Sequence, residues 1–183
     1  IIRDEKPVMA YDVRVQCWTC EAAPLPLDRP PFREFVEGGW LTVCSGDAVD
    51  FAHVRDWIVD VGTTNEIASW AFDKTFSQQL ASELLNDHGF AIFPFSQSAR
   101  FYNEPIRTML RLLHDGLLFH GDNPCLAWQA GNLTIRRNQR DEWLPEKSSR
   151  AAKVDGIVTL LMALSEALYH GQPRGTDSAI VAL

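Results

Sequence analysis

The segment KVDGIVTLLMAL, residues 153–164, constrains the fold more than any other stretch of this chain. From Ile157 to its end only Thr159 is polar, which predicts a helix buried on nearly all sides. Asp155 and Gly156 stand where this helix should begin. An unpaired buried charge is costly, and glycine inside a helix costs about 1 kcal/mol relative to alanine. We therefore expect Asp155 to lie in or at the rim of the core, with a partner that compensates for its burial.

The composition is that of one globular domain. The chain has 183 residues, of which 46% are hydrophobic and 22% charged, enough for a substantial core. No run approaches the roughly 18 apolar residues of a membrane span, and charges interrupt the first residues too early for a signal peptide. We expect a soluble intracellular protein without a membrane partner. The G-x-x-x-x-G-K-[ST] loop of ATPases and the G-x-S-x-G nucleophile elbow are both absent from the sequence.

The cysteines do not form a zinc pattern. Cys17 and Cys20 make one C-x-x-C, but Cys44 and Cys125 stand alone, so no second pair completes a tetrahedral site. We expect packed thiols in a reducing compartment.

Strand and helix patterns alternate along the chain. The expected strands are residues 8–20, 40–46, 66–72, 90–95 and a hairpin over 133–144. The expected helices are residues 32–37, 50–62, 75–89, 105–116, 126–131 and a long helix from Ser148 or Ser149 to about Leu168. This alternation predicts an α/β (α+β) fold, a mixed β-sheet flanked by helices. We place one domain at residues 1–169 and a tail at residues 170–183.

Asp73 follows the expected strand 66–72, where a helix N-cap would be the usual interpretation. However, Thr75 and Gln78 fit a capping box and can begin the next helix by themselves. Asp73 is then available for another role at the carboxyl end of a strand, where open α/β sheets tend to bind ligands. Capping and ligand binding remain equal alternatives for this residue.

Helix capping is also an alternative for Asp155, because this residue could cap a helix that starts at Gly156. The preceding residues are compatible with a helix, so we expect a turn or more before Asp155 and no capping role for its carboxylate. Two carboxylates from a strand end and a facing helix are a layout for divalent cations. Two such ions about 3.5–4 Å apart can activate a water and stabilise the leaving oxygen in phosphodiester hydrolysis. On this hypothesis Gly156 keeps the metal site unobstructed.

Residues 132–153 are basic although the chain carries a net charge of -7. The basic residues of this segment are Arg136, Arg137, Arg140, Lys147, Arg150 and Lys153, against Asp141, Glu142 and Glu146. A solvated hairpin followed by the polar start of a helix would explain this excess. A local basic strip is also what a nuclease needs in order to contact a DNA backbone.

Four segments, in this order, resemble the nuclease domain of large terminase subunits from tailed bacteriophages: FVEGGWLTVCSGDAVDFAHVRDWI, EIASWAFDKTFSQQLASELLNDHGF, LLFHGDNPCLAWQAGNLTI and EKSSRAAKVDGIVTLLMALSEAL. The most specific element is K-x-D-G-I-V-x-L-x-M-A-L. The resemblance extends from about Val13 to Leu168.

The resemblance implies a ribonuclease-H-like fold and a metal-dependent endonuclease that cuts concatemeric viral DNA during genome packaging. The second acidic residue of the family falls on Asp73 and its last on Asp155, which would hold two Mg²⁺ or Mn²⁺ ions. Lys147 and Lys153 would lie in the basic approach to the site. The hairpin would contact double-stranded DNA through Arg136, Arg137 and Arg140.

The resemblance further implies packaging partners, namely the ATPase domain of the same subunit, the portal protein and the small terminase subunit. The place of action would be the host cytoplasm, at the viral procapsid. The family's first metal-binding Asp lies on an opening strand that we expect to be missing here, and neither Asp4 nor Asp12 matches it. Two alternatives stay open: an inactive domain that docks DNA or the portal, and another ribonuclease-H-like nuclease such as a junction resolvase.

Overall fold

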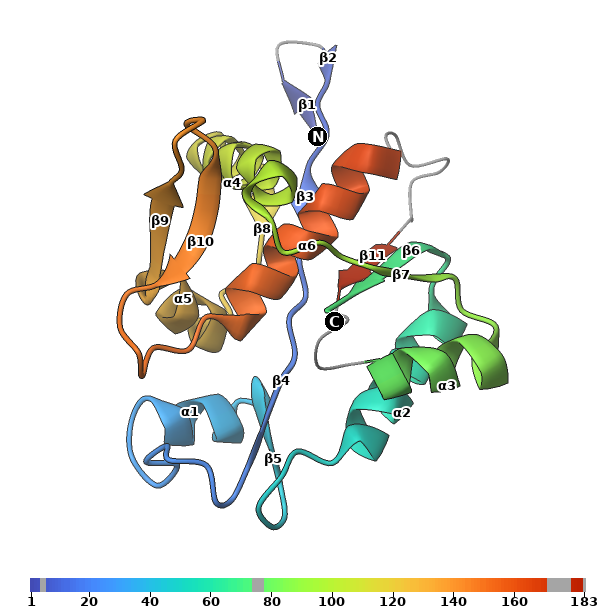
Figure 1. The fold of residues 1–183 in the computed structure, drawn as a ribbon, viewed down its shortest axis with the longest axis vertical. Coiled ribbons are helices and arrows are strands. Elements are labelled where there is room, and N and C mark those ends of the chain that lie inside the picture. Colours follow the sequence, from blue (N-terminus) through green and yellow to red (C-terminus); the bar gives the residue numbers. More distant parts are fainter. Residues whose placement is uncertain (4–5, 74–77, 171–178, 183) are drawn as a thin grey trace.

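The structure of the chain is a computed structural model that describes all residues except 4–5, 74–77, 171–178 and 183. Helices and strands alternate along it (Figure 1). The helices are α1 (Phe32–Glu37), α2 (Phe51–Thr64), α3 (Gln78–His88), α4 (Ala99–His114), α5 (Pro124–Gly131) and α6 (Asp155–His170). The strands are β1 (Ile2–Arg3), β2 (Lys6–Pro7), β3 (Tyr11–Asp12), β4 (Cys17–Cys20), β5 (Leu41–Cys44), β6 (Ile67–Phe72), β7 (Ile92–Pro94), β8 (Leu118–Phe119), β9 (Leu133–Arg137), β10 (Trp143–Lys147) and β11 (Ala179–Ala182).

Helix α6 runs through the middle of the fold. The helix α4 and the β9–β10 hairpin lie on one side of it, and β6, β7 and β11 lie on the other (Figure 1). Its apolar residues Ile157, Leu160, Leu161, Met162 and Leu164 are all buried, together with side chains of α4, in the main hydrophobic cluster. The buried helix predicted from residues 157–164 is therefore confirmed.

The strand pairs are short, and both parallel and antiparallel pairs occur. Strand β6 pairs in parallel with β7 and β11, β4 pairs in parallel with β5, and β3 pairs in parallel with β8. Strands β9 and β10 form an antiparallel hairpin. The α/β class with mixed strand pairing is confirmed. Because β6 and β7 are parallel, with Phe72 opposite Pro94, the segments that follow them leave the same edge of the sheet.

The start of α6 corrects the prediction of an earlier helix from Ser148 or Ser149. The backbone N–H of Ser148 donates to the Asn132 carbonyl at 2.9 Å, and the N–H of Ala152 donates to the Ser149 carbonyl at 3.1 Å. These residues use their hydrogen bonds to extend the hairpin and to form a turn, so α6 begins only at Asp155. Asp155 is therefore in the first turn of the helix.

Three other boundaries differ from the sequence prediction. Helix α4 begins at Ala99 and holds Pro105 inside it, whereas Pro105 was expected to open the helix. The expected strand 8–20 is split into β3 and β4, because each half pairs with a different strand. Residues 179–182 of the predicted tail form β11 beside β6. The Thr75 part of the predicted capping box lies outside the described residues.

No helix in the described part of the chain combines the length and the apolar character that a membrane span requires.

Candidate active site

Asp73 lies directly after β6 and is half-buried. The side chain of Gln97, which follows β7, donates a hydrogen bond from Nε2 to the Asp73 Oδ2 at 2.6 Å. The Phe95 N–H also donates to the Phe72 carbonyl at 2.8 Å, so the two strand ends are held together. The parallel pairing of β6 and β7 thus brings Gln97 to the predicted ligand. Sequence reasoning missed Gln97, although its position shortly after a neighbouring strand could have indicated it.

Tyr102 of α4 adds a second neighbour to Asp73. Its side chain is 1% exposed, and its hydroxyl has no hydrogen-bond partner among the described residues. Burial, followed by the nearby negative charge of Asp73, raises the pKa of Tyr102 above its usual range. A buried hydroxyl without a partner normally costs about 1–3 kcal/mol, so this spot is suited to a water or a ligand atom.

Asp155 is the first residue of α6, and its side chain is 79% exposed. Lys147 at the end of β10 places its Nζ 3.9 Å from the Asp155 Oδ1. A negative charge in the first turn is favoured by the helix dipole. The expectation of a buried Asp155 is therefore wrong: α6 begins one residue before its buried run, so the carboxylate remains in solvent.

The backbone of Gly156 packs closely against two side chains. A Cβ at this position would lie 3.0 Å from the Gln129 Oε1 and 3.2 Å from the Val15 Cγ1. The Gly156 N–H donates to the same Gln129 oxygen at 2.6 Å. The glycine thus permits close packing against α5 and the segment before β4.

The two carboxylates belong to elements that pack together. Helix α6 lies against β6, where the Ser69 hydroxyl donates to the Glu166 Oε2 at 2.8 Å. Oxygen ligands of this kind suit a hard divalent cation, which needs only one or two carboxylates when waters and phosphates complete its shell. No group of three or more His, Cys, Asp or Glu side chains that could share a metal occurs among the described residues.

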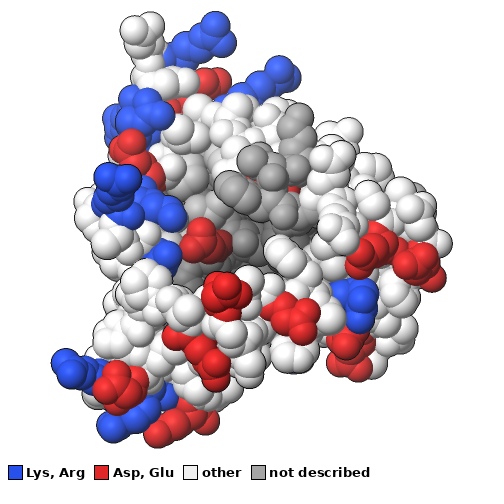
Figure 2. Space-filling model, turned by 60° about the horizontal axis from the view of Figure 1, so that its bottom comes forward, with Lys and Arg blue, Asp and Glu red and all other residues white. Residues whose placement is uncertain are grey.

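The predicted DNA-binding residues lie on or near the β9–β10 hairpin. Figure 2 shows Lys and Arg side chains along its left edge, the side on which β9 and β10 lie in Figure 1. Most of these cations have internal carboxylate partners: Arg136 with Glu146 at 3.5 Å, Arg137 with Asp141 at 3.4 Å, and Lys147 with Asp155 at 3.9 Å. Within the described structure no carboxylate lies within 4.0 Å of Arg140 or Lys153.

The hairpin is docked onto α4 through Trp143. Its backbone N–H donates to the Asn103 Oδ1 at 3.1 Å, and the Arg107 guanidinium lies 4.3 Å from the centre of its ring. The Arg137 guanidinium lies 5.1 Å from the same ring. These contacts fix the turn end of the hairpin on α4, so its cations have a defined position relative to α4.

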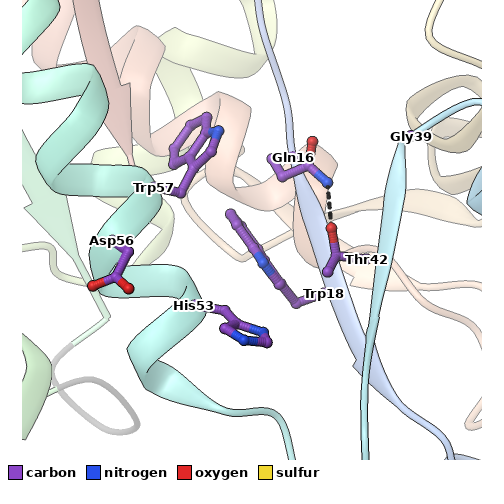
Figure 3. A pocket seen from close by; sticks show the side chains of 7 residues that line it. All are labelled: Gln16, Trp18, Gly39, Thr42, His53, Asp56 and Trp57. Carbon is purple, nitrogen blue, oxygen red and sulfur yellow. Dashed lines mark hydrogen bonds between the residues drawn. The ribbon is translucent and has the colours of Figure 1, made fainter.

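A pocket of about 380 Å³ lies elsewhere, between α2 and the β4–β5 pair (Figure 3). It is lined by Gln16, Trp18, Gly39, Thr42, His53, Asp56 and Trp57. The Trp18 and Trp57 rings meet edge to face with centroids 5.5 Å apart. Neither Asp73 nor Asp155 lines this pocket, so the predicted cleavage site is not located there.

The chain is similar to known proteins in sequence and in fold. The sequence model of the family "Terminase large subunit, endonuclease domain" matches residues 28–171. Protein YmfN of Escherichia coli (strain K12) is 27% identical over 146 residues, covering 76% of this chain and 31% of that protein. The terminase large subunit of Enterobacteria phage HK97 is 24% identical over 151 residues, covering 82% of this chain and 30% of that protein.

The crystal structure of the HK97 bacteriophage large terminase superposes with a TM-score of 0.70 at 24% identity, over 82% of this chain and 32% of that one. The chain thus spans about 31% of the length of YmfN and 30% of that of the HK97 subunit. Its fold is ribonuclease-H-like. The chain belongs to the family of terminase large subunit endonuclease domains.

Proposed function

We propose that this chain is a metal-dependent endodeoxyribonuclease that cuts double-stranded DNA, with Asp73 and Asp155 as the metal ligands. The observation that carries the proposal is the surroundings of Asp73. A half-buried carboxylate at the end of parallel strands is held by Gln97 and lies near a buried Tyr102 hydroxyl with no partner. This is a prepared polar site at the edge where ligands bind in open α/β sheets.

The donor set fits Mg²⁺ or Mn²⁺. Both ions prefer carboxylate and water oxygens, and Mg²⁺ in particular uses few protein ligands together with substrate phosphate oxygens. When bound, two such ions supply a water of lowered pKa and stabilise the leaving oxygen of phosphodiester hydrolysis. Since the described residues offer two carboxylates and no cluster of three, waters and the DNA backbone would complete the coordination.

The residues of the chain have distinct roles in this proposal. Gln97 would orient the Asp73 carboxylate through its hydrogen bond to Oδ2. Lys147 neutralises Asp155 before a metal binds, because its ammonium is 3.9 Å from that carboxylate. With Asp155 engaged as a metal ligand, Lys147 would be available to pair with the phosphate backbone instead.

DNA would approach along the β9–β10 hairpin. Arg140 and Lys153 would contact phosphates first, since no described carboxylate within 4.0 Å neutralises them. Arg136 and Arg137 would exchange Glu146 and Asp141 for phosphate. Such contacts are independent of sequence and weaken as salt concentration rises.

Family membership supports a proposal for the biological setting. We propose that the chain cuts concatemeric viral DNA during packaging, in the host cytoplasm at the procapsid. Its partners there would be the ATPase domain of the same subunit, the portal protein and the small terminase subunit. The competing function is an inactive domain that docks DNA or the portal.

The direct test is nicking of supercoiled plasmid with Mn²⁺, with Mg²⁺ and with a chelator. We expect metal-dependent nicking by the wild-type chain and its loss in Asp73→Asn and in Asp155→Asn. Nicking that persists in both variants would show that neither Asp73 nor Asp155 is needed for cleavage. DNA binding without nicking, unchanged in both variants, would support the docking domain.

A further inference from the structure

The residues on either side of Asp155 are each held by an amide side chain from the end of α5. The Asn132 Nδ2 donates to the Lys153 carbonyl at 3.1 Å. The Gln129 Oε1 accepts from the Gly156 N–H at 2.6 Å. The backbone that carries Asp155 is therefore fixed at two points, two residues before it and one residue after it. We call Gln129 and Asn132 together the amide clamp.

The clamp replaces an ordinary helix cap. The first N–H groups of a helix have no partner within it, and a Ser, Thr, Asp or Asn at the N-cap usually accepts from one of them. The residue before α6 is Val154, whose side chain has no oxygen. Gln129, which is distant in sequence, accepts from Gly156 in its place. The position of the first turn of α6 is therefore set by α5.

The Gln129 amide is itself held in one orientation. Its side chain is 5% exposed, and its Nε2 lies 3.2 Å from the Cys17 Sγ and 3.6 Å from the Cys125 Sγ. Rotating the amide by half a turn would point its NH₂ at the Gly156 N–H and leave two donors facing each other. The absence of a Cβ at Gly156 allows this close approach, since a Cβ there would lie 3.0 Å from the Gln129 Oε1.

We propose that Gln129 and Asn132 are positioning residues for the metal ligand Asp155. This inference rests on the proposed function. The Asp155 side chain is exposed, and its one ion pair within 4.0 Å among the described residues is with the flexible Lys147. Packing therefore does not hold the carboxylate, and its place is set by the backbone of residues 153–156. Loss of the clamp would let the first turn of α6 fray and move the ligand.

The test compares Gln129→Met and Asn132→Ala with the wild-type chain in two measurements. Hydrogen exchange at the Gly156 amide reports the clamp itself, without any metal. Calorimetric titration with MnCl₂ reports the position of the ligand. We expect faster exchange at Gly156 in Gln129→Met and a roughly tenfold or greater loss of Mn²⁺ affinity in both variants, the range typical of residues that orient metal ligands.

Two controls separate positioning from general stability. Gln79→Met makes the same change on the exposed surface of α3, and Ile58→Val lowers the stability of a hydrophobic cluster separate from that of α6. Both should keep wild-type Mn²⁺ affinity. Wild-type affinity in Gln129→Met and Asn132→Ala would overturn the inference, as would unchanged exchange at Gly156. A wild-type chain that binds no Mn²⁺ would instead overturn the proposed function, and the inference with it.

Discussion

The Gln97 side chain donates from Nε2 to the Asp73 Oδ2 at 2.6 Å and so connects the segments that follow β6 and β7. The segments that carry the two residues start from the same edge of the sheet, because β6 and β7 are parallel. The contact restrains the orientation of the Asp73 carboxylate. Each part of the site can be tested separately.

The first prediction concerns this hydrogen bond. Gln97→Leu should lower the rate of metal-dependent nicking about tenfold, because residues that orient metal ligands typically contribute this much. Gln97 is exposed, so the unfolding temperature should stay close to that of the wild type. Gln79→Leu is the matched control, since Gln79 is also exposed and also donates to a carboxylate, that of Glu83 at 3.1 Å. Equal rates in the two variants would count against a role for Gln97.

The second prediction concerns pH. Burial and the charge of Asp73 raise the pKa of Tyr102, so the folded state holds this proton to a higher pH than the unfolded chain does. The protonation of Tyr102 therefore leaves the free energy of unfolding unchanged below the unfolded pKa of about 10 and lowers it as the pH rises from there toward the raised folded pKa. In urea unfolding, the free-energy difference between wild type and Tyr102→Phe should be constant from pH 7 to 9. As the pH rises further toward 11, the wild type should become less stable relative to Tyr102→Phe.

At neutral pH Tyr102→Phe should be neutral or stabilising by about 1 kcal/mol, because it removes a buried hydroxyl that has no described partner. A loss of 2 kcal/mol or more at pH 7 would mean that the hydroxyl has a strong partner in solution.

The third prediction concerns Gly156. Alanine has the higher helix propensity by about 1 kcal/mol, but its Cβ would be 3.0 Å from the Gln129 Oε1 and 3.2 Å from the Val15 Cγ1. Overpacking of this kind typically costs about 1–3 kcal/mol, so we expect Gly156→Ala to destabilise the chain in urea unfolding. Gly131→Ala is the control, because no described atom outside its own helix backbone and its chain neighbours would lie within 4 Å of a Cβ there, and it should be neutral or stabilising. If both substitutions changed the free energy of unfolding in the same direction, the result would contradict the close packing found at Gly156.

The fourth prediction concerns DNA binding. Arg140→Ala and Lys153→Ala should each weaken binding to duplexes of any sequence and reduce the slope of log K against log salt by about 1. Fluorescence anisotropy in a chelating buffer measures this without cleavage. Arg33→Ala, on α1 and paired with Glu37, should leave the slope unchanged. An equal effect of all three substitutions would argue against a binding surface on the hairpin.

The sequence predicted the elements better than their ends. The apolar run of α6 and the position of Asp73 after a strand follow from local pattern, and both are confirmed. The predicted start of α6 was wrong because backbone groups of Ser148 and Lys153, which precede the helix, form hydrogen bonds with Asn132 instead. Strand β11 was missed because its pairing with β6 is a long-range contact that a short apolar run does not reveal.

The candidate site was predicted less completely. Asp73 and Asp155 came from the sequence, but the reason given for Asp155 did not hold, since its side chain is exposed. The sequence did not indicate Gln97, Tyr102 or Gln129. The fold brings these residues to the site from other segments of the chain, and no local motif marks them.

The central claim is that Asp73 and Asp155 hold a metal together, and calorimetric titration with MnCl₂ tests it most directly. Wild type, Asp73→Asn, Asp155→Asn and the double variant should be compared at one pH. The account predicts binding by the wild type, weaker binding by each single variant and none by the double variant. Wild-type affinity in either single variant, or no binding by the wild type, would contradict it.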